Sequence, residues 1–195
     1  SDLVCSNFLF PSAGAQEWVR FANALKLKMY MRISGVADVQ SAVDALVAEG
    51  NFPTSDVAWM GCWTDEGGKA NPYFSEEFGS YTSVQKNVSL NLALQGTMSS
   101  YNDARLAAFF DPSSNGNYTG AISGTNFSVS ASDHGAGYWC RPAVRFNSPV
   151  YLITVSEVEF FLAEYYAKKD PSKAEAHYKA AVDASFASAG VTGAD

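Results

Sequence analysis

The chain has 195 residues, of which 47% are hydrophobic and 17% are charged, and this composition excludes a disordered protein. The length suits one well-buried core, with two small domains as the alternative. The net charge is −7 and no basic run is present, which argues against nucleic acid and anionic lipid surfaces as partners and favours an uncharged or basic ligand.

Cysteine spacing and apolar stretches exclude several further classes of protein. Cys5, Cys62 and Cys140 lie far apart without a CxxC pair, so we predict neither a disulfide framework nor a zinc site. We interpret all three as buried thiols, with one bonded pair as the alternative. No stretch approaches the roughly 18 apolar residues of a membrane helix, and no signal peptide is recognisable. We therefore expect the sequence to be part of a longer protein whose targeting segment lies upstream.

The pattern of residues 16–50 predicts an αα-hairpin. The first helix is expected over residues 16–34 and the second over residues 38–49, with Gly35 and Gly50 ending them. Apolar side chains recur at three- and four-residue steps along the first helix and predict its buried face. They are Trp18, Phe21, Ala22, Leu25, Met29 and Ile33.

The composition changes over residues 51–150, which are rich in Gly, Asn, Ser and Pro. We predict one helix here, over residues 101–110, and short strands at 57–60, 127–130 and 144–146. An irregular stretch of this length inside a compact domain is either functional or disordered, and its many aromatic residues disfavour disorder. These residues are Trp59, Trp63, Tyr73, Phe74, Phe78, Tyr81, Tyr138 and Trp139. We therefore expect this part to carry the function.

A second αα-hairpin is predicted over residues 154–190, with tetratricopeptide spacing. Two capping boxes, at 154–157 and 172–175, open its helices, and Asp170-Pro171 separates them. The side chains expected between the helices are Leu162, Tyr166, Tyr178 and Ala181. Because one hairpin of this kind cannot bury both of its faces, it must stack on other helices.

These elements predict a mainly α protein. Its tetratricopeptide-like helical hairpins, of the α-α superhelix type, flank a loop-rich, irregular insertion that carries a few short strands. We treat residues 1–195 as part of a single domain, with hairpins at 16–50 and 154–190 and the aromatic insertion at 51–150.

Enzyme signatures are weak in this sequence. His134 begins a Gly-rich segment similar to the oxyanion loop of esterases, but no GxSxG motif accompanies it. Neither His134 nor His177 has a partner set for metal binding or nucleophilic catalysis. The acidic pairs Asp65-Glu66 and Glu76-Glu77 leave a glycosidase open, although adjacent acids in a solvated loop are far more often plain surface charge. We therefore predict no catalysis and no cofactor.

Residues 111–117 begin like a calcium-binding loop, with oxygen-bearing side chains at alternating positions and a glycine at the turn. The twelfth position of this loop is Ile122 instead of an acidic residue. We therefore interpret the segment as a turn and predict no metal site.

Four segments combine into a more specific pattern. Trp18–Met29 reads WVRFANALKLKM, Asp103–Leu106 reads DARL, Tyr118–Gly120 reads YTG and precedes Gly124, and Thr154–Glu164 reads TVSEVEFFLAE. In this order they resemble the WxxFANSLRLR, DPRL, YxG…G and TxAEVxFLxAE motifs of the SusD/RagB family of nutrient-binding outer-membrane lipoproteins. Ala104 and Ser156 depart from these motifs. The order is completed by Ala174, Tyr178 and the segment 184–190.

The resemblance implies a central portion of a non-catalytic protein that captures glycans at the outward-facing surface of the outer membrane. It also implies delivery to a SusC-like TonB-dependent transporter in Bacteroidetes-like bacteria, with an N-terminal lipid as the only membrane attachment. Two other functions stay open. One is a tetratricopeptide scaffold for protein interactions, and the other is a glycoside hydrolase that uses loop carboxylates.

The matching motifs contain packing and capping positions, so candidate ligand-binding residues come from chemistry alone. Sugar rings stack their C–H faces on flat aromatic side chains, while their hydroxyls need hydrogen-bonding partners. The candidates are Trp63, Asn71, Tyr73, Tyr138, Trp139 and Arg141. Packing in the core is the competing interpretation for each of the aromatic rings.

Overall fold

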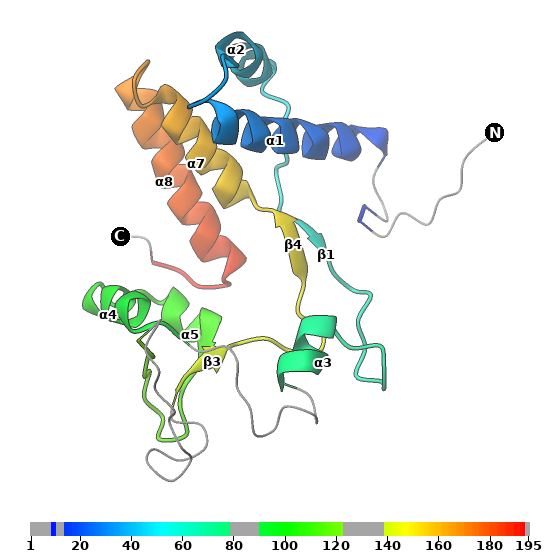
Figure 1. The fold of residues 1–195 in the computed structure, drawn as a ribbon, viewed down its shortest axis with the longest axis vertical. Coiled ribbons are helices and arrows are strands. Elements are labelled where there is room, and N and C mark those ends of the chain that lie inside the picture. The colour runs from blue at the N-terminus through cyan, green and yellow to red at the C-terminus, as the bar shows by residue number, and fades with distance from the viewer. Residues whose placement is uncertain (1–8, 11–13, 79–89, 123–138, 194–195) are drawn as a thin grey trace, which may run out of the picture. The chain divides into compact units, whose positions relative to one another are not determined.

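The computed structural model describes residues 9–10, 14–78, 90–122 and 139–193. The chain is mainly helical, as predicted, with seven helices and a few short strands among the described residues (Figure 1). It divides into two compact units. Unit 1 contains the residues up to Cys62 and Pro149–Ser188, and unit 2 contains Trp63–Ser148 and Ala189–Gly193.

Unit 1 contains the predicted N-terminal hairpin, made of α1 (Ala15–Ile33) and α2 (Gln40–Glu49). Helix α2 ends at Gly50, which adopts the left-handed conformation (φ 62°) and donates its N–H to the carbonyl of Leu46. Glycine adopts this conformation without the steric cost of a Cβ atom, which explains why the helix ends here.

Only part of the predicted face of α1 is buried: Phe21 packs against the core of unit 1 and Leu25 is half-buried, but the rest is exposed. Trp18, Met29 and Ile33 leave 45%, 57% and 41% of their surface exposed, whereas the buried residues of this helix are Asn23, Ala24 and Leu27. Small side chains allow α1 to approach α2 and α7 closely, and the buried Asn23 amide donates to Asn51 O (3.1 Å). The helix has apolar residues on more than one face, so their spacing alone pointed to the larger, exposed stripe.

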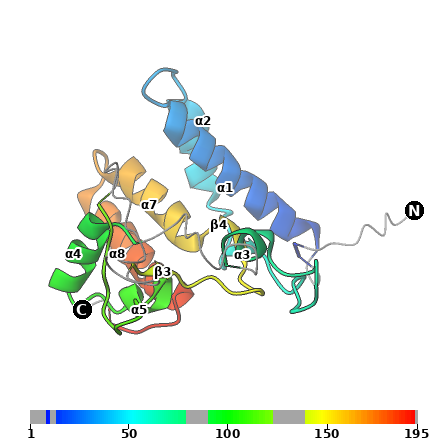
Figure 2. The same cartoon turned by 60° about the horizontal axis from the view of Figure 1, so that its bottom comes forward.

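The second hairpin of unit 1 consists of α7 (Val155–Tyr166) and α8 (Pro171–Ser188), which lie side by side in Figures 1 and 2. Thr154 caps α7, because its hydroxyl accepts a hydrogen bond from Glu157 N (3.1 Å). Leu162 and Ala181 are buried between the helices, with 6% and 0% of their surface exposed. The predicted hairpin is therefore confirmed.

Three details of this hairpin differ from the prediction, the first being that Tyr166 is half-buried instead of buried. Tyr178 leaves 59% of its surface exposed instead of filling the space between the helices. Helix α8 is capped by Asp170, whose Oδ1 accepts a hydrogen bond from Lys173 N (3.2 Å), and not by Ser172. Pro171 then occupies the first helical position, where its missing N–H costs nothing, so the helix begins before the predicted capping box.

A short antiparallel ribbon completes unit 1. It pairs β1 (Val57–Trp59) with β4 (Val150–Ile153), and Val57 lies opposite Ile153 in the register. The strand expected at 57–60 is thus confirmed. Both facing residues join the core of unit 1, whose buried members are Ala24, Leu27, Val43, Leu46, Val57, Ile153, Val158 and Leu162.

Unit 2 contains three short helices, α3 (Pro72–Phe78), α4 (Leu92–Ser100) and α5 (Arg105–Phe109). A second ribbon pairs β2 (Phe110–Asp111) with β3 (Arg141–Pro142). The core of this unit contains the buried residues Leu90, Met98, Leu106 and Cys140.

The sequence predicted less of unit 2 than of unit 1. The helix expected over 101–110 begins later, at α5, and helices α3 and α4 were not expected. Residues 144–146 do not form the expected strand, because the chain pairs earlier, in β3, and later, in β4. The strand expected at 127–130 lies outside the described residues.

Candidate functional site

Asn71, one of the predicted ligand-binding residues, lies at the start of α3 and is 4% exposed. Its Oδ1 caps the helix by accepting hydrogen bonds from Tyr73 N (2.9 Å) and Phe74 N (3.3 Å). Its Nδ2 donates to Ser148 O (2.8 Å), and its backbone N–H donates to Phe146 O (2.7 Å). Both ends of the amide are therefore engaged within unit 2, which gives Asn71 a structural role. Contact of this side chain with a ligand stays a prediction.

The hydrogen bonds of Asn71 also bring distant parts of unit 2 together. They join the start of α3 to residues 146–148, a segment that follows β3 along the chain. Tyr73 lies in the first turn of α3 and leaves 42% of its surface exposed. Trp63 is half-buried in the loop that precedes α3. A hydrogen bond from Thr64 N to Lys69 O (2.9 Å) closes this loop.

The second group of candidates surrounds Cys140. Trp139 and Arg141 are both half-buried, and Arg141 lies opposite Asp111 in the β2–β3 ribbon. Between them Cys140 is fully buried, and its sulfur accepts a hydrogen bond from Thr119 N (3.0 Å). Tyr138 lies outside the described residues.

The cysteines differ in burial. Among the described residues, Cys140 is a buried free thiol as expected, whereas Cys62 is free and half-buried, so the expectation that it is buried is wrong. Cys5 lies outside the described residues.

A backbone junction supports the second group. Leu90 N donates to Cys140 O (2.9 Å), and Ala121 N donates to Leu90 O (2.7 Å). Gly120 is buried at this junction, where a Cβ atom would lie 2.7 Å from both Cα and N of Leu92. The glycine of the YTG motif is therefore required for close packing of two backbone segments and not for a ligand.

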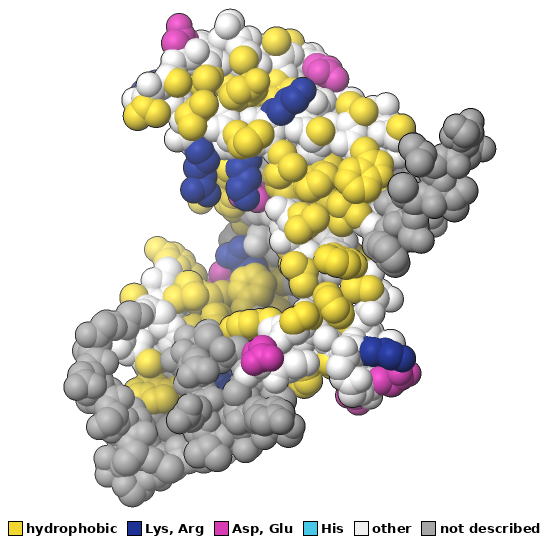
Figure 3. Space-filling view, turned by 45° about the vertical axis from the view of Figure 1, so that its right-hand side comes forward, with side chains coloured by type: hydrophobic (Ala, Val, Ile, Leu, Met, Phe, Trp, Pro, Cys, Tyr) yellow, Lys and Arg dark blue, Asp and Glu magenta, His cyan; other side chains and the backbone are white. Residues whose placement is uncertain are grey.

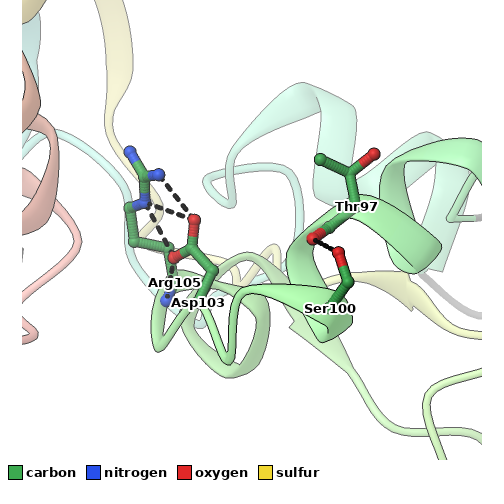
Figure 4. Close-up of polar contacts among 4 residues, drawn as sticks. All are labelled: Thr97, Ser100, Asp103 and Arg105. Atoms are coloured by element: carbon green, nitrogen blue, oxygen red, sulfur yellow. Dashed lines mark hydrogen bonds and ion pairs between the residues drawn. The ribbon is translucent and has the colours of Figure 1, made fainter.

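The DARL motif also has a structural role. Asp103 Oδ1 accepts a hydrogen bond from Arg105 N (3.0 Å), and its Oδ2 pairs with Arg105 Nη2 at 2.6 Å (Figure 4). This contact lowers the pKa of Asp103 and raises that of Arg105, because the hydrogen bonds stabilise both charged forms. Figure 4 also shows Ser100, whose hydroxyl donates to Thr97 O (2.9 Å) near the end of α4.

The calcium-like segment forms a turn, as expected. Ser113 is buried, and its hydroxyl donates to Asn117 O (2.6 Å), which closes the turn around Gly116. Both carboxylate oxygens of Asp111 pair with the guanidinium of Arg145 (2.6 and 2.8 Å). Within the described residues, no group of three or more His, Cys, Asp or Glu side chains could hold a metal ion.

His177, the histidine that lies within the described residues, contributes to the contact between α7 and α8. His177 Nδ1 lies 2.6 Å from Glu159 Oε2, and the ring stacks on Tyr166 with centroids 5.3 Å apart and planes 2° apart. The ring therefore joins α8 to α7. His134 lies outside the described residues. Of the loop carboxylates, Asp65 is exposed and Glu66 pairs with Lys69.

The arrangement offers aromatic rings on an ordered backbone, and its polar side chains mostly bind one another. Such a surface suits stacking on the apolar face of a ligand. In the part of the chain that the structure describes, none of the helices combines the length and the hydropathy needed to span a bilayer.

Comparison of the sequence with protein-family models identifies the family to which the chain belongs. The model of the family SusD-like_2, described as "Starch-binding associating with outer membrane", matches residues 6–193. No curated protein matches the chain.

Solved structures similar to the chain share this fold. A SusD homolog from Bacteroides uniformis is 26% identical, with a TM-score of 0.81 over 99% of this chain. A chitin-binding SusD homolog from Flavobacterium johnsoniae is 27% identical, with a TM-score of 0.72 over 91%. A SusD-like protein from Bacteroides thetaiotaomicron is 28% identical, with a TM-score of 0.71 over 92%. The chain spans 41%, 36% and 37% of the lengths of these three structures.

Proposed function

The chain belongs to the SusD-like family of starch-binding proteins associated with the outer membrane, and we propose that it captures oligosaccharides at the cell surface. The family consists of non-catalytic binding proteins, so capture requires a surface and no reaction. The observation that carries this proposal is the family match, which covers residues 6–193. The chitin-binding relative supports a polysaccharide as the ligand class.

Aromatic residues of unit 2 support the proposal chemically. Tyr73 is exposed at the capped start of α3, and Trp63 and Trp139 are half-buried in ordered backbone. Rings fixed by the backbone lose little conformational entropy when a sugar stacks on them, so they suit a glycan. We propose that Trp63, Tyr73, Tyr138 and Trp139 supply stacking faces and that Arg141 supplies hydrogen bonds. Asn71 supports this surface by holding α3 to residues 146–148.

A calorimetric screen of starch, chitin and other neutral oligosaccharides tests the proposal. Trp63→Ala and Trp139→Ala are expected to weaken binding by about 1–3 kcal/mol, or roughly fivefold to 150-fold, while the Tm changes little. Tyr101→Ala is the matched control, because this ring is 82% exposed in unit 2 and is not a candidate.

Two results would contradict this assignment of residues. If both tryptophan variants unfold, the rings belong to the core and the ligand face lies elsewhere. If the full-length protein binds none of the oligosaccharides, glycan capture itself is wrong. Release of reducing sugars during the screen would instead support the hydrolase alternative.

We further propose that the full-length protein delivers its ligand to a SusC-like TonB-dependent transporter and is held at the outer membrane by an N-terminal lipid. Outer-membrane association in the family description supports this location. Affinity purification of the full-length protein from detergent-solubilised outer membranes should recover a large β-barrel protein in a stoichiometric complex. Recovery of the protein alone under mild detergent conditions would count against this partnership.

A further inference from the structure

Residues 145–148 form a turn that contacts two other segments of unit 2, and we call it the linking turn. Within it, Ser148 N donates to Arg145 O (3.0 Å), and Arg145 N donates to Ser148 Oγ (2.8 Å). Backbone and side chain therefore both close the turn. Figure 1 shows the chain after β3 (yellow) running towards α3 before it enters β4, and the linking turn lies on this stretch.

One side of the linking turn is held to α3. Asn71 Nδ2 donates to Ser148 O (2.8 Å), and Asn71 N donates to Phe146 O (2.7 Å). The oxygen of the same amide caps α3, where Tyr73 lies in the first turn. Because Asn71 is only 4% exposed, water competes little for these hydrogen bonds. The position of the linking turn is therefore tied to that of α3.

The other side of the linking turn is held to β2 by an ion pair. Arg145 Nη1 and Nη2 donate to the two carboxylate oxygens of Asp111 (2.8 and 2.6 Å). These hydrogen bonds raise the pKa of Arg145, and two parallel bonds between planar groups fix orientation as well as distance. Asp111 lies opposite Arg141 in the β2–β3 ribbon, and Trp139 precedes this ribbon closely along the chain. The linking turn thus connects α3 with the segment around Trp139.

These contacts join the two groups of candidate ligand-binding residues. The contact with Asn71 spans 77 positions of the sequence and that with Asp111 spans 34, so both are tertiary contacts. We propose that Arg145 is a positioning residue, which holds the group around Tyr73 at a fixed separation from the group around Trp139 so that one oligosaccharide binds both. This inference rests on the glycan capture proposed above. Two rigidly spaced subsites bind a long ligand tightly, because contact with the first raises the effective concentration at the second.

Two other roles of Arg145 fit the observations less well. Recruitment of an anionic ligand is disfavoured, because two guanidinium nitrogens already bind Asp111 and the chain has a net charge of −7. Lys and Arg side chains are also spread over the face drawn in Figure 3, among hydrophobic ones. A role in overall stability alone is disfavoured, because the side chains of Arg145 and Asp111 are 54% and 35% exposed and such ion pairs stabilise a fold little.

Oligosaccharides of two lengths test the proposal on the full-length protein. Displacement calorimetry compares maltose with maltoheptaose, and chitobiose with chitohexaose. We expect Arg145→Met to bind the longer sugar about threefold to tenfold more weakly, and the disaccharide with less than about a twofold change. Lys179→Met, which removes the cation of an exposed pair within α8, is the control and should change neither affinity. An equal loss for both lengths, or a loss for neither, would overturn the proposal.

Two further variants separate positioning from an indirect effect of the substitution. Arg145→Lys keeps the charge but loses the two-pronged geometry, so it should recover part of the affinity for the longer sugar. Ser148→Ala removes the acceptor for Arg145 N and keeps the ion pair, and we expect a smaller loss that again depends on ligand length. If circular dichroism shows that Arg145→Met is unfolded, Ser148→Ala decides the question. Unfolding of both variants would overturn the proposal, since the turn then serves only stability.

Hydrogen exchange tests the link without any ligand. The Asn71 amide, which donates to Phe146 O, should exchange at least about threefold faster in Arg145→Met, because the turn is then held from one side only. The Ala121 amide, which donates to Leu90 O, is the internal control and should not change. An unchanged rate at Asn71 would overturn the link while leaving glycan capture intact. Faster exchange in a protein whose wild type binds none of the sugars would instead overturn glycan capture, and the positioning role with it.

Discussion

Asp44 joins three side chains of unit 1 through hydrogen bonds. Its Oδ1 accepts hydrogen bonds from Tyr165 Oη (2.6 Å), Lys169 Nζ (2.5 Å) and Gln40 Nε2 (2.9 Å). These bonds, led by that from Lys169, lower the pKa of Asp44 from 3.8 to about 2. The cluster links α2 to the end of α7, so the protonation state of one carboxylate affects the contact between two helices.

The sign of this shift predicts a stability change at low pH. A carboxylate whose pKa is lower in the folded protein stabilises it above the unfolded pKa and loses that contribution as the pH falls towards 2. Urea unfolding of the wild-type protein and of Asp44→Asn between pH 2 and 5 measures the contribution. We expect the wild type to lose more stability than Asp44→Asn over this interval. Parallel pH profiles would show that the cluster contributes nothing in solution, where its exposed charges are screened.

Gly120 permits a second prediction at this scale. A methyl group here would meet the backbone at Leu92 at 2.7 Å, and backbone cannot move aside as a flexible side chain can. Gly120→Ala should therefore lower the free energy of unfolding by about 1–3 kcal/mol in denaturant titrations. Gly96→Ala is the matched control, since nothing lies within 4 Å of its new Cβ and alanine favours the helix α4. Unchanged stability of Gly120→Ala would show that residues 90–92 do not approach Gly120 this closely.

At the scale of elements, helix ends were predictable where the cap is local in sequence. Thr154 and Gly50 were both recognisable because each acts on residues within four positions along the chain. Helices α3 and α4 of unit 2 were missed, whereas α5 was predicted with other bounds. Helix α4 contains Gly96, Thr97 and two serines, which have low helix propensity, and it forms because Asn91 caps it and Met98 is buried in the core.

Helix α8 offers a test of competing caps. Asp170→Ala should cost about 1 kcal/mol of stability, because it removes the acceptor for Lys173 N. Ser172→Ala should change stability by only a few tenths of a kcal/mol, since Ser172 is exposed in the first turn and does not cap the helix. Thermal unfolding of the two variants decides between the caps. A larger loss in Ser172→Ala would restore the capping box predicted from the sequence.

At the scale of the whole molecule, charge bears on the ligand. The net charge of −7 repels polyanions, whereas stacking of a neutral sugar on an aromatic ring does not depend on ionic strength. We therefore expect a neutral polysaccharide to bind with nearly the same affinity at low and high salt. Its sulfated derivative should bind more weakly, and most weakly at low salt. Affinity electrophoresis or calorimetry at two salt concentrations measures both, and tighter binding of the sulfated form would contradict the prediction.

The sequence alone also determined a good part of the architecture and little of the site. Both hairpins and the family motifs were readable because helix periodicity, caps and turn glycines depend on neighbours along the chain. Tertiary structure decided which face of α1 is buried, since Ala24 and Leu27 face other helices while the larger Trp18 and Met29 do not. It likewise showed that Asn71 bonds to residues 146–148, a contact across most of unit 2. Burial and hydrogen-bond partners depend on what lies opposite in space, and periodicity does not contain that information.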